Sequence, residues 1–356
     1  MSEQQSQPHP SGRHRRQLAA LGRILRVLAP MCVSAALIAW LLHKVDIRNV
    51  IAVVRDGVDY RYLLLMTVLT ALSFIFRGIR WGIQLRAAGI PRLPALTECV
   101  SIFGAYALNL IFTYLGEAWR CVYISRTTKA KISTVVGTDI GDRGSDAVMI
   151  LLLAILASIV ARPAITTFLD RYSIGQRLIG MIHDGTLLTW LILVPALLAA
   201  ACFLLRHTKP MQALFRSAER MWKGFAVLFH MKGWPLYILL TFGIWGCYFM
   251  ETYVCFWAFP FTRHLLEMPG MAHGLIPGLV VFVFGSFSIA IPSNGGLGPW
   301  NIAVAFALSL YGISDTDGAA YSLLYWSFQS AMIILLGIFS AGYIAVRRRH
   351  MAAAHA

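Results

Sequence analysis

The feature that most constrains this chain is a series of long, uninterrupted apolar runs separated by short charged stretches. Several runs are long enough to cross a hydrocarbon core of about 30 Å as a helix that rises 1.5 Å per residue. In lipid every backbone amide must be paired within a helix or a closed barrel. Because these runs are uniformly apolar rather than alternating, they indicate helices. The runs are Val27 to Leu42, Tyr62 to Phe76, Ala147 to Ala161, Leu187 to Leu205, Leu236 to Phe259 and Leu323 to Val346.

Composition favours a chain without a sizeable water-soluble domain. Only 13% of the 356 residues are charged, against about 25% in an ordinary soluble domain. We therefore expect a basic cytoplasmic tail (1–26), a single integral-membrane domain (27–346) and a short cytoplasmic tail (347–356). The Arg-rich start resembles a signal peptide, but no small-x-small cleavage site follows Trp40, so the first run is predicted to remain as a helix.

Charge determines the expected topology. The formal net charge is +15, but the basic residues lie in short stretches between apolar runs rather than on one amphipathic face, so no nucleic-acid partner is expected. The positive-inside rule explains these residues and predicts that the stretches face the cytoplasm, with both termini on the cytoplasmic side of a bacterial inner membrane. The stretches are the N-terminal tail, segments 77–92, 120–143 and 206–232, and Arg347 to Arg349.

The segment Leu96 to Leu115 is apolar enough to cross the membrane, yet it separates two strongly basic segments. A full crossing would leave one of those segments outside, in conflict with the positive-inside rule. A re-entrant or broken segment that returns to the cytoplasm removes the conflict. Such a backbone is tolerated where protein or a water-filled cavity surrounds it.

A second interrupted segment lies between Ala272 and Gly312. Pro292 and the glycines that follow disfavour a helix interior, so we expect two half-helices that meet at a glycine turn and enter from the outside. Paired broken segments, one from each face, are typical of transporters with a site near the bilayer midplane. The expected fold class is all-α, a polytopic membrane helical bundle with about six full spans and two re-entrant or broken helical hairpins.

Ionisable residues at membrane depth are candidates for a structural or functional role, because each raises the free energy of membrane insertion by about 2.5 to 3.5 kcal/mol. Arg77, Arg80 and Trp81 follow the second apolar run. The simplest interpretation is a snorkelling anchor with an interfacial Trp.

Glu117 and Arg120 lie near the first predicted break, three residues apart. Their spacing allows an internal ion pair on one helical face. Alternatively, together with Asn109 they form a site for a phospholipid headgroup, in which Arg120 holds the phosphate and Glu117 holds a cationic or hydroxyl group.

Asp139, Asp142, Arg143 and Asp146 fall at helical spacing just before a long apolar helix. A charged stripe of this kind could enter the bundle and pair with Arg80 or Arg120. Acidic residues at a helix N-terminus also complement the helix dipole, which is a sufficient structural reason. Three acids could further suggest a divalent metal or a proton relay, but the spacing alone does not favour either.

Four short motifs follow one another over residues 60 to 345. They are Arg80-Trp81, Gly116-Glu117-Ala118-Trp119-Arg120, Asp142-Arg143-Gly144-Ser145-Asp146 and Pro292-Ser293-Asn294-Gly295-Gly296-Leu297-Gly298. In order and spacing they resemble the flippase-like transmembrane family, typified by the N-terminal membrane half of bifunctional lysylphosphatidylglycerol synthases. The chain departs from that pattern at Thr113-Tyr114-Leu115, where many members have Pro-Gly, and at Asn301, where many have Glu.

The resemblance implies a lipid transporter that moves a phospholipid or a lipid-linked amphiphile between leaflets. Its partner would be a membrane phospholipid. No metal and no cofactor are expected, and no lipid aminoacylation activity is predicted, since the aminoacyl-transfer domain of the bifunctional synthases is absent. A homo-oligomer or a partner membrane protein stays open. The substrate-binding residues would be Arg80, Asn109, Glu117, Arg120, Asp142, Arg143, Asp146, Asn294, Gly295, Gly296, Gly298 and Asn301.

Three other functions stay open from the residues alone. The same broken helices would suit a secondary transporter of a small soluble solute. The acids between Asp139 and Asp146 would suit a membrane enzyme that acts on a lipid-linked substrate. A scaffold without transport is the third. No GxxxxGK followed by Ser or Thr is present, so transport would be passive, gradient-driven or coupled to a partner.

Overall fold

The computed structural model describes residues 57–164 and 231–353, together with the isolated positions 55, 166, 193, 208, 212, 219, 222 and 226. The described part contains helices and no strand, in agreement with the predicted all-α class. The predicted helices Val27 to Leu42 and Leu187 to Leu205 and the N-terminal tail lie outside it. The elements are α3 (Tyr60–Ala87), α4 (Ala95–Ile111), α5 (Leu115–Thr128), α6 (Ile132–Val160), α11 (Trp234–Ala258), α12 (Pro260–Glu267), η2 (Ala272–Gly274), α13 (Leu275–Ser288), η3 (Asn294–Gly296), α14 (Pro299–Ser309) and α15 (Asp315–Ala353).

In the described part of the chain, four helices are long and apolar enough to cross a membrane: α3, α6, α11 and residues Asp315–Arg347 of α15. They correspond to four of the predicted runs. Three are longer than predicted: α3 continues past Phe76 to Ala87, α6 begins at Ile132 rather than near Ala147, and α15 begins at Asp315 rather than at Leu323. Segments 77–92 and 120–143 are therefore mostly helical rather than loops.

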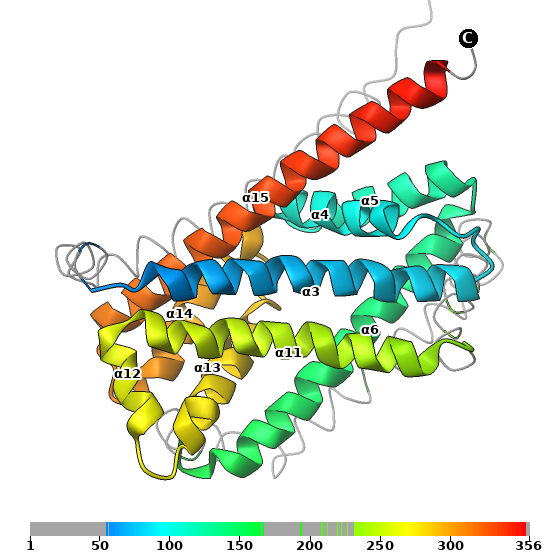
Figure 1. The fold of residues 1–356 in the computed structure, drawn as a ribbon. Helices are drawn as coiled ribbons and strands as arrows, with labels where there is room; N and C mark the ends of the chain where they lie inside the picture. The colour runs from blue at the N-terminus through cyan, green and yellow to red at the C-terminus, as the bar shows by residue number, and fades with distance from the viewer. Residues whose placement is uncertain are drawn as a thin grey trace, which may run out of the picture.

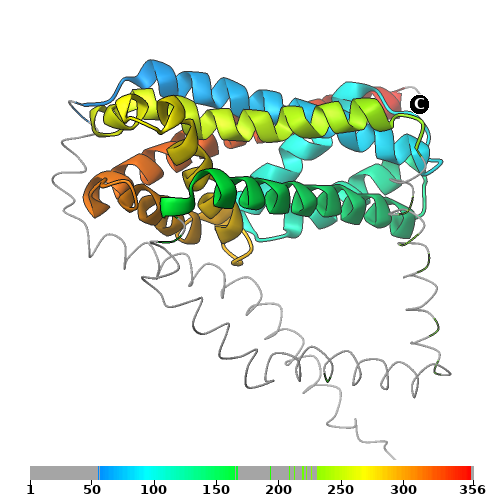
Figure 2. The same ribbon diagram turned by 90° about the horizontal axis from the view of Figure 1, so that it is seen from below.

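The helices α3 and α11 run antiparallel and side by side along the bundle (Figure 1). Their ends are joined by a hydrogen bond of 2.8 Å from the Asp59 backbone N–H to the Ala258 carbonyl. Leu63 and Met66 of α3 pack there in one buried apolar cluster with Phe256 of α11. Figure 2 shows the pair on one side of the bundle and α6 on the other.

Both predicted breaks are helix–turn–helix hairpins. The α4–α5 hairpin turns at Tyr114, whose φ is 62°. The α13–α14 hairpin turns through η3, where Gly295, Gly296 and Gly298 have φ values of 59°, 79° and 95°. Glycine suits these positions because it adopts positive φ without a steric penalty. The hairpins enter from opposite ends of the bundle (Figure 1).

The tips of the two hairpins touch each other. The Thr113 hydroxyl donates to Oδ1 of Asn294 at 2.9 Å. Trp326 of α15 donates from Nε1 to the Gly295 carbonyl at 2.8 Å. A Cβ added at Gly295 would lie 2.5 Å from the Leu110 side chain, so the second tip fits closely against the end of α4. These hydrogen bonds pair polar groups of the two turns that would be costly to leave unpaired in lipid.

Exposed basic side chains gather at one end of the bundle, where α3 and α5 end and α6 and α11 begin. The opposite end mixes Asp59, Glu267, Asp315 and Asp317 with Arg55, Arg61, Arg162 and Arg263. The exposed basic residues at the first end are Arg86, Arg92, Arg126, Lys129, Lys131, Lys232 and Arg349.

Candidate functional site

Two arginines of α3 and two aspartates of α6 form a buried grid of ion pairs. Arg77 and Arg80 are three residues apart and Asp142 and Asp146 four apart, so each pair lies on one helical face. Nη1 of Arg77 lies 2.7 Å from Asp146 and 3.2 Å from Asp142. Nη2 of Arg80 lies 2.6 Å from Asp142 and 2.9 Å from Asp146. Each arginine thus bridges both aspartates.

The interpretation of Arg77, Arg80 and Trp81 as a snorkelling anchor is wrong. Both arginines are buried, at 2% and 0% exposure, because α6 supplies carboxylates that replace water around the guanidinium groups. Trp81 is also fully buried rather than interfacial. Its ring centre lies 4.5 Å from the Arg120 guanidinium carbon, a cation–π distance, and its Nε1 donates to Thr138 at 3.2 Å.

Arg120 of α5 turns inward to α6. It is fully buried, forms an ion pair with Asp139 and lies 3.7 Å from Asp142. The prediction that the aspartate stripe pairs with Arg80 or Arg120 is confirmed. The predicted internal pair between Glu117 and Arg120 is wrong: a spacing of three residues permits it, but α6 offers each side chain a partner on another helix.

Glu117 pairs with Arg143 instead. Their nearest oxygen and nitrogen lie 2.6 Å apart, and the side chains retain 22% and 39% exposure. Asn109 of α4 holds Glu117 in place, donating from Nδ2 to the second carboxylate oxygen at 3.0 Å. The side-chain Oδ1 of Asn109 accepts a hydrogen bond from the Gly116 backbone N–H at 2.8 Å. We call Glu117 and Arg143 the rim pair, because they are the partly exposed members of this arrangement.

The eight charged residues form one balanced network, which we call the charge network. Four arginines (Arg77, Arg80, Arg120, Arg143) face four carboxylates (Glu117, Asp139, Asp142, Asp146), so the formal charge is zero. Charges are tolerated at membrane depth when they pair with one another in this way. Some donors are still unused: Nε of Arg77, Arg80 and Arg120 and Nη1 of Arg120 are buried without a hydrogen-bond partner in the described part.

A family model described as the lysylphosphatidylglycerol synthase TM region matches residues 27–337, which include all eight residues of the charge network. The chain belongs to this family. No curated protein and no solved structure shows significant similarity to it. Membership in the lysylphosphatidylglycerol synthase TM family indicates a membrane protein associated with lipid handling.

In this family member, α11 contributes side chains to the network that were not predicted as site residues. Thr241 accepts from Arg80 at 3.3 Å, and Trp245 donates to Asp146 at 3.4 Å. The Tyr237 ring lies 5.4 Å from the Arg80 guanidinium carbon. Tyr237, Thr241 and Trp245 recur every four residues, so a polar stripe at helical spacing was the available signal. Arg77 and Asp139 were also missed as members of the site.

The predicted site residues of the glycine turn take no part in the ion pairs of the charge network. Asn301 is fully buried and its Oδ1 accepts from the Gly298 N–H at 3.0 Å, which caps α14. Asn294 bonds the other hairpin through Thr113. Gly295, Gly296 and Gly298 form the turn itself. These contacts give the five residues a structural role, and their contact with a substrate stays a prediction.

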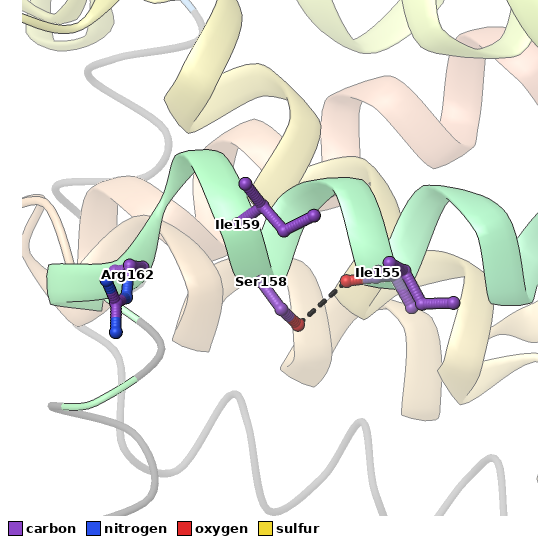
Figure 3. A pocket seen from close by; sticks show the side chains of 5 residues that line it. Ile155, Ser158, Ile159 and Arg162 are labelled. Atoms are coloured by element: carbon purple, nitrogen blue, oxygen red, sulfur yellow. Dashed lines mark hydrogen bonds between the residues drawn. The ribbon is translucent and has the colours of Figure 1, made fainter.

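The best-formed hollow on the described part lies on α6 and does not include the charge network. Figure 3 shows this hollow on the outward face of α6, away from the charge network, lined by Ala154, Ile155, Ser158, Ile159 and Arg162. The Ser158 hydroxyl donates to the Ala154 carbonyl at 2.8 Å, so it serves the helix's own backbone. Within residues 57–164 and 231–353, no group of three or more His, Cys, Asp or Glu side chains is placed to hold a metal ion.

Proposed function

We propose that this chain is a lipid transporter that moves a phospholipid or a lipid-linked amphiphile between the leaflets of a bacterial cytoplasmic membrane. One observation carries the proposal. A charge-balanced network lies inside the helical bundle, and its partly exposed members are one arginine and one glutamate, the rim pair Glu117 and Arg143. A phospholipid headgroup carries a partner for each of them: its phosphate can bind the arginine, and its cationic or hydroxyl group can bind the glutamate.

Headgroup binding then proceeds by exchange of ion pairs. Every arginine of the charge network already faces a carboxylate, so a phosphate has to replace one. Arg143 is the arginine that solvent reaches, and a guanidinium binds phosphate through two parallel hydrogen bonds. Glu117, once released, accepts the cationic or hydroxyl end of the same headgroup. The buried donors of Arg120 that have no partner are further positions for phosphate oxygens.

The hairpins give this exchange a path across the membrane. The α4–α5 hairpin carries Asn109, Glu117 and Arg120, and the α13–α14 hairpin touches its tip from the opposite side. If the two tips part, a polar route opens from the charge network to the turn of the α13–α14 hairpin. The headgroup would follow this route while the acyl chains of the lipid stay in the bilayer. The outer face of α6 suits those chains, because Leu151, Leu152 and Ile155 are exposed there.

We place the end of the bundle that carries exposed basic residues in the cytoplasm, following the positive-inside rule. The charge network lies toward that end, so the substrate first binds from the inner leaflet. We favour transport over catalysis because Asp139, Asp142 and Asp146 face guanidinium groups rather than one another.

The decisive experiment measures headgroup movement in proteoliposomes that contain the purified protein and fluorescent anionic, zwitterionic or aminoacylated phospholipids. We expect the wild-type protein to accelerate translocation of at least one lipid, and the variant Glu117→Gln, Arg143→Gln to lose that acceleration. Arg61→Gln is the matched control, since Arg61 forms an exposed ion pair of 2.8 Å with Asp59 at the other end of the bundle.

Two outcomes would count against the proposal. If the well-folded wild-type protein moves none of these lipids, transport of them is excluded and solute counterflow becomes the next assay. If the rim-pair variant and the Arg61 variant move lipid equally well, the rim pair is not the binding site.

A further inference from the structure

Glu251 is a buried acid that the charge network does not include. It lies in α11, within the apolar run Leu236 to Phe259, and its exposure is 0%. Its Oε2 accepts hydrogen bonds from the Tyr325 hydroxyl at 3.0 Å and from Nε2 of Gln329 at 2.9 Å. Its other oxygen, Oε1, is buried and has no hydrogen-bond partner in the described part.

Among the residues that the structure describes, none supplies a cation next to Glu251. On its own helix the nearest titratable groups are Cys247, Tyr248 and Cys255. From α15 it faces Tyr325, and from α3 it faces the Thr70 hydroxyl. The helices α13 and α14, which complete this side of the bundle, carry no titratable side chain, and the nearest acid of α6 is Asp146, beyond Trp245.

Other buried acids of the described part differ from Glu251 in this respect. Asp142 and Asp146 each touch two arginines, and Glu98 lies 3.0 Å from Arg86. An unpaired ionised carboxylate is costly to bury, whereas the neutral acid is far less so. In the packing described here, the neutral form is the one that suits Glu251.

We propose that Glu251 is a proton-binding site, which holds a proton in this closed conformation and releases it when the surrounding helices part. The proton would reside on Oε1, which leaves Oε2 to accept both hydrogen bonds. A larger cation does not fit, because Oε1 is enclosed by protein atoms and a metal ion would need several oxygen ligands around it. Uptake converts the carboxylate to the carboxylic acid, with bulk water as proton source and acceptor.

The position of Glu251 connects this proton to the charge network. Tyr248 lies three residues before Glu251 on the same helix and within electrostatic range of Glu251, Arg77 and Asp146. Trp245, three residues earlier, donates to Asp146. Loss of the proton would add a negative charge near a network whose formal charge is zero. That charge would attract the arginines of α3 and weaken their ion pairs with the aspartates of α6. Only this coupling rests on the proposed transport function, since proton binding itself can be observed without a substrate.

Infrared spectroscopy of the reconstituted protein tests the site directly. We expect a carbonyl stretching band of a protonated carboxyl group near neutral pH that shifts in D₂O, disappears at alkaline pH and is absent from Glu251→Gln. The matched control is Glu98→Gln, which removes a buried acid that has an arginine partner and should leave the band unchanged. Absence of the band from the wild-type protein, or its persistence in Glu251→Gln, would overturn the proposal.

A second variant keeps the test valid if Glu251→Gln does not fold. Tyr325→Phe removes one hydrogen bond to Oε2 and should change the pH at which the band disappears while leaving the band in place. Glutamine mimics the neutral acid, so we also expect Glu251→Gln to melt within a few degrees of the wild-type protein. If Tyr325→Phe leaves the titration of the band unchanged, the band arises elsewhere.

Lipid translocation under opposite pH gradients tests the coupling. We expect the wild-type rate to depend on the direction of the gradient and the Glu251→Gln rate to be the same in both directions. Equal wild-type rates in both directions would refute the coupling. A wild-type protein that moves no lipid but shows the band would refute the proposed transport function and leave the proton site standing.

Discussion

The Nη2 atom of Arg80 lies 2.6 Å from Oδ1 of Asp142, and both side chains are completely buried. Arg77 contacts the same aspartate at 3.2 Å, and Arg120 approaches it at 3.7 Å. Asp142 therefore joins α3, α5 and α6 through a single side chain. Its removal leaves three arginines with one carboxylate fewer among them.

We expect Asp142→Asn to lower the free energy of unfolding by about 3 to 5 kcal/mol, because breaking a buried ion pair leaves an uncompensated buried charge. Thermal unfolding of the detergent-solubilised protein, followed by circular dichroism, would measure the loss. Asp315→Asn, at an exposed acid at the start of α15, should melt close to the wild-type protein. Equal melting temperatures for the two variants would show that the buried ion pairs contribute little.

The rim pair should affect transport far more than stability. Charge-assisted hydrogen bonds contribute about 1.5 to 3 kcal/mol, so Arg143→Gln alone should slow lipid translocation by roughly 10- to 100-fold. The pair is partly exposed, so its own contribution to folding is expected to be only about 0.2 to 1 kcal/mol.

Exchanging the two charges tests the rim pair further. The double variant Glu117→Arg, Arg143→Glu keeps the ion pair but moves the phosphate-binding group to α5. We expect it to melt above both single variants and still to transport poorly. Full recovery of transport would indicate that only the ion pair matters, and not the position of the arginine.

Gly116 permits the close approach of α5 to α4. A Cβ added at Gly116 would overlap the Ala105 backbone carbonyl, which cannot move aside as a side chain can. We expect Gly116→Ala to destabilise the protein by about 1 to 3 kcal/mol through overpacking and to displace Glu117. Gly246→Ala is the matched control, because a Cβ at that helical glycine would meet no atom within 4 Å. Similar melting curves for the two variants would argue against this packing.

The contact between the hairpin tips can be tested by cross-linking. The side chains of Thr113 and Asn294 lie within hydrogen-bond distance, so the variant Thr113→Cys, Asn294→Cys should form a disulfide under mild oxidation, detectable by mass spectrometry of the joined peptides. If the tips part during transport, oxidation should stop lipid translocation and a reductant should restore it. Transport that continues at full rate with the bridge in place would contradict the proposed path.

Hydrophobic runs and chain breaks were predictable because they follow from local composition. Four long apolar helices and both interrupted segments are visible in the sequence, since proline, glycine and charge act on the helix that contains them. The ends of these helices were less predictable. The helix α3 continues through Arg77 and Arg80 because another helix neutralises them, and no local pattern shows that partner.

In the charge network, too, the features that follow from local spacing were predictable and most of the partners on other helices were not. The spacing of Asp142 and Asp146 predicted a charged stripe on one helical face. Pairing of this stripe with arginines of other helices could be predicted from it. The spacing of Glu117 and Arg120 allowed an internal pair, but Arg143 and Asp139 become their partners once α5 packs on α6. Glu251 could have been predicted as a functional residue from the sequence, because an acid inside an apolar run is unfavourable to insert into a membrane.

The hairpin tip contact has a consequence for how the protein is made. Thr113 and Asn294 are 181 residues apart, so at about 5 to 20 residues per second the ribosome completes the second turn roughly 10 to 40 s after the first. Throughout that interval the nascent first turn lacks the neighbour that later covers its polar groups, and insertion machinery, water or a chaperone has to shield it. Chains interrupted before the second turn should therefore be recognised as unassembled and degraded, even when every long helix that precedes the interruption is already in the membrane.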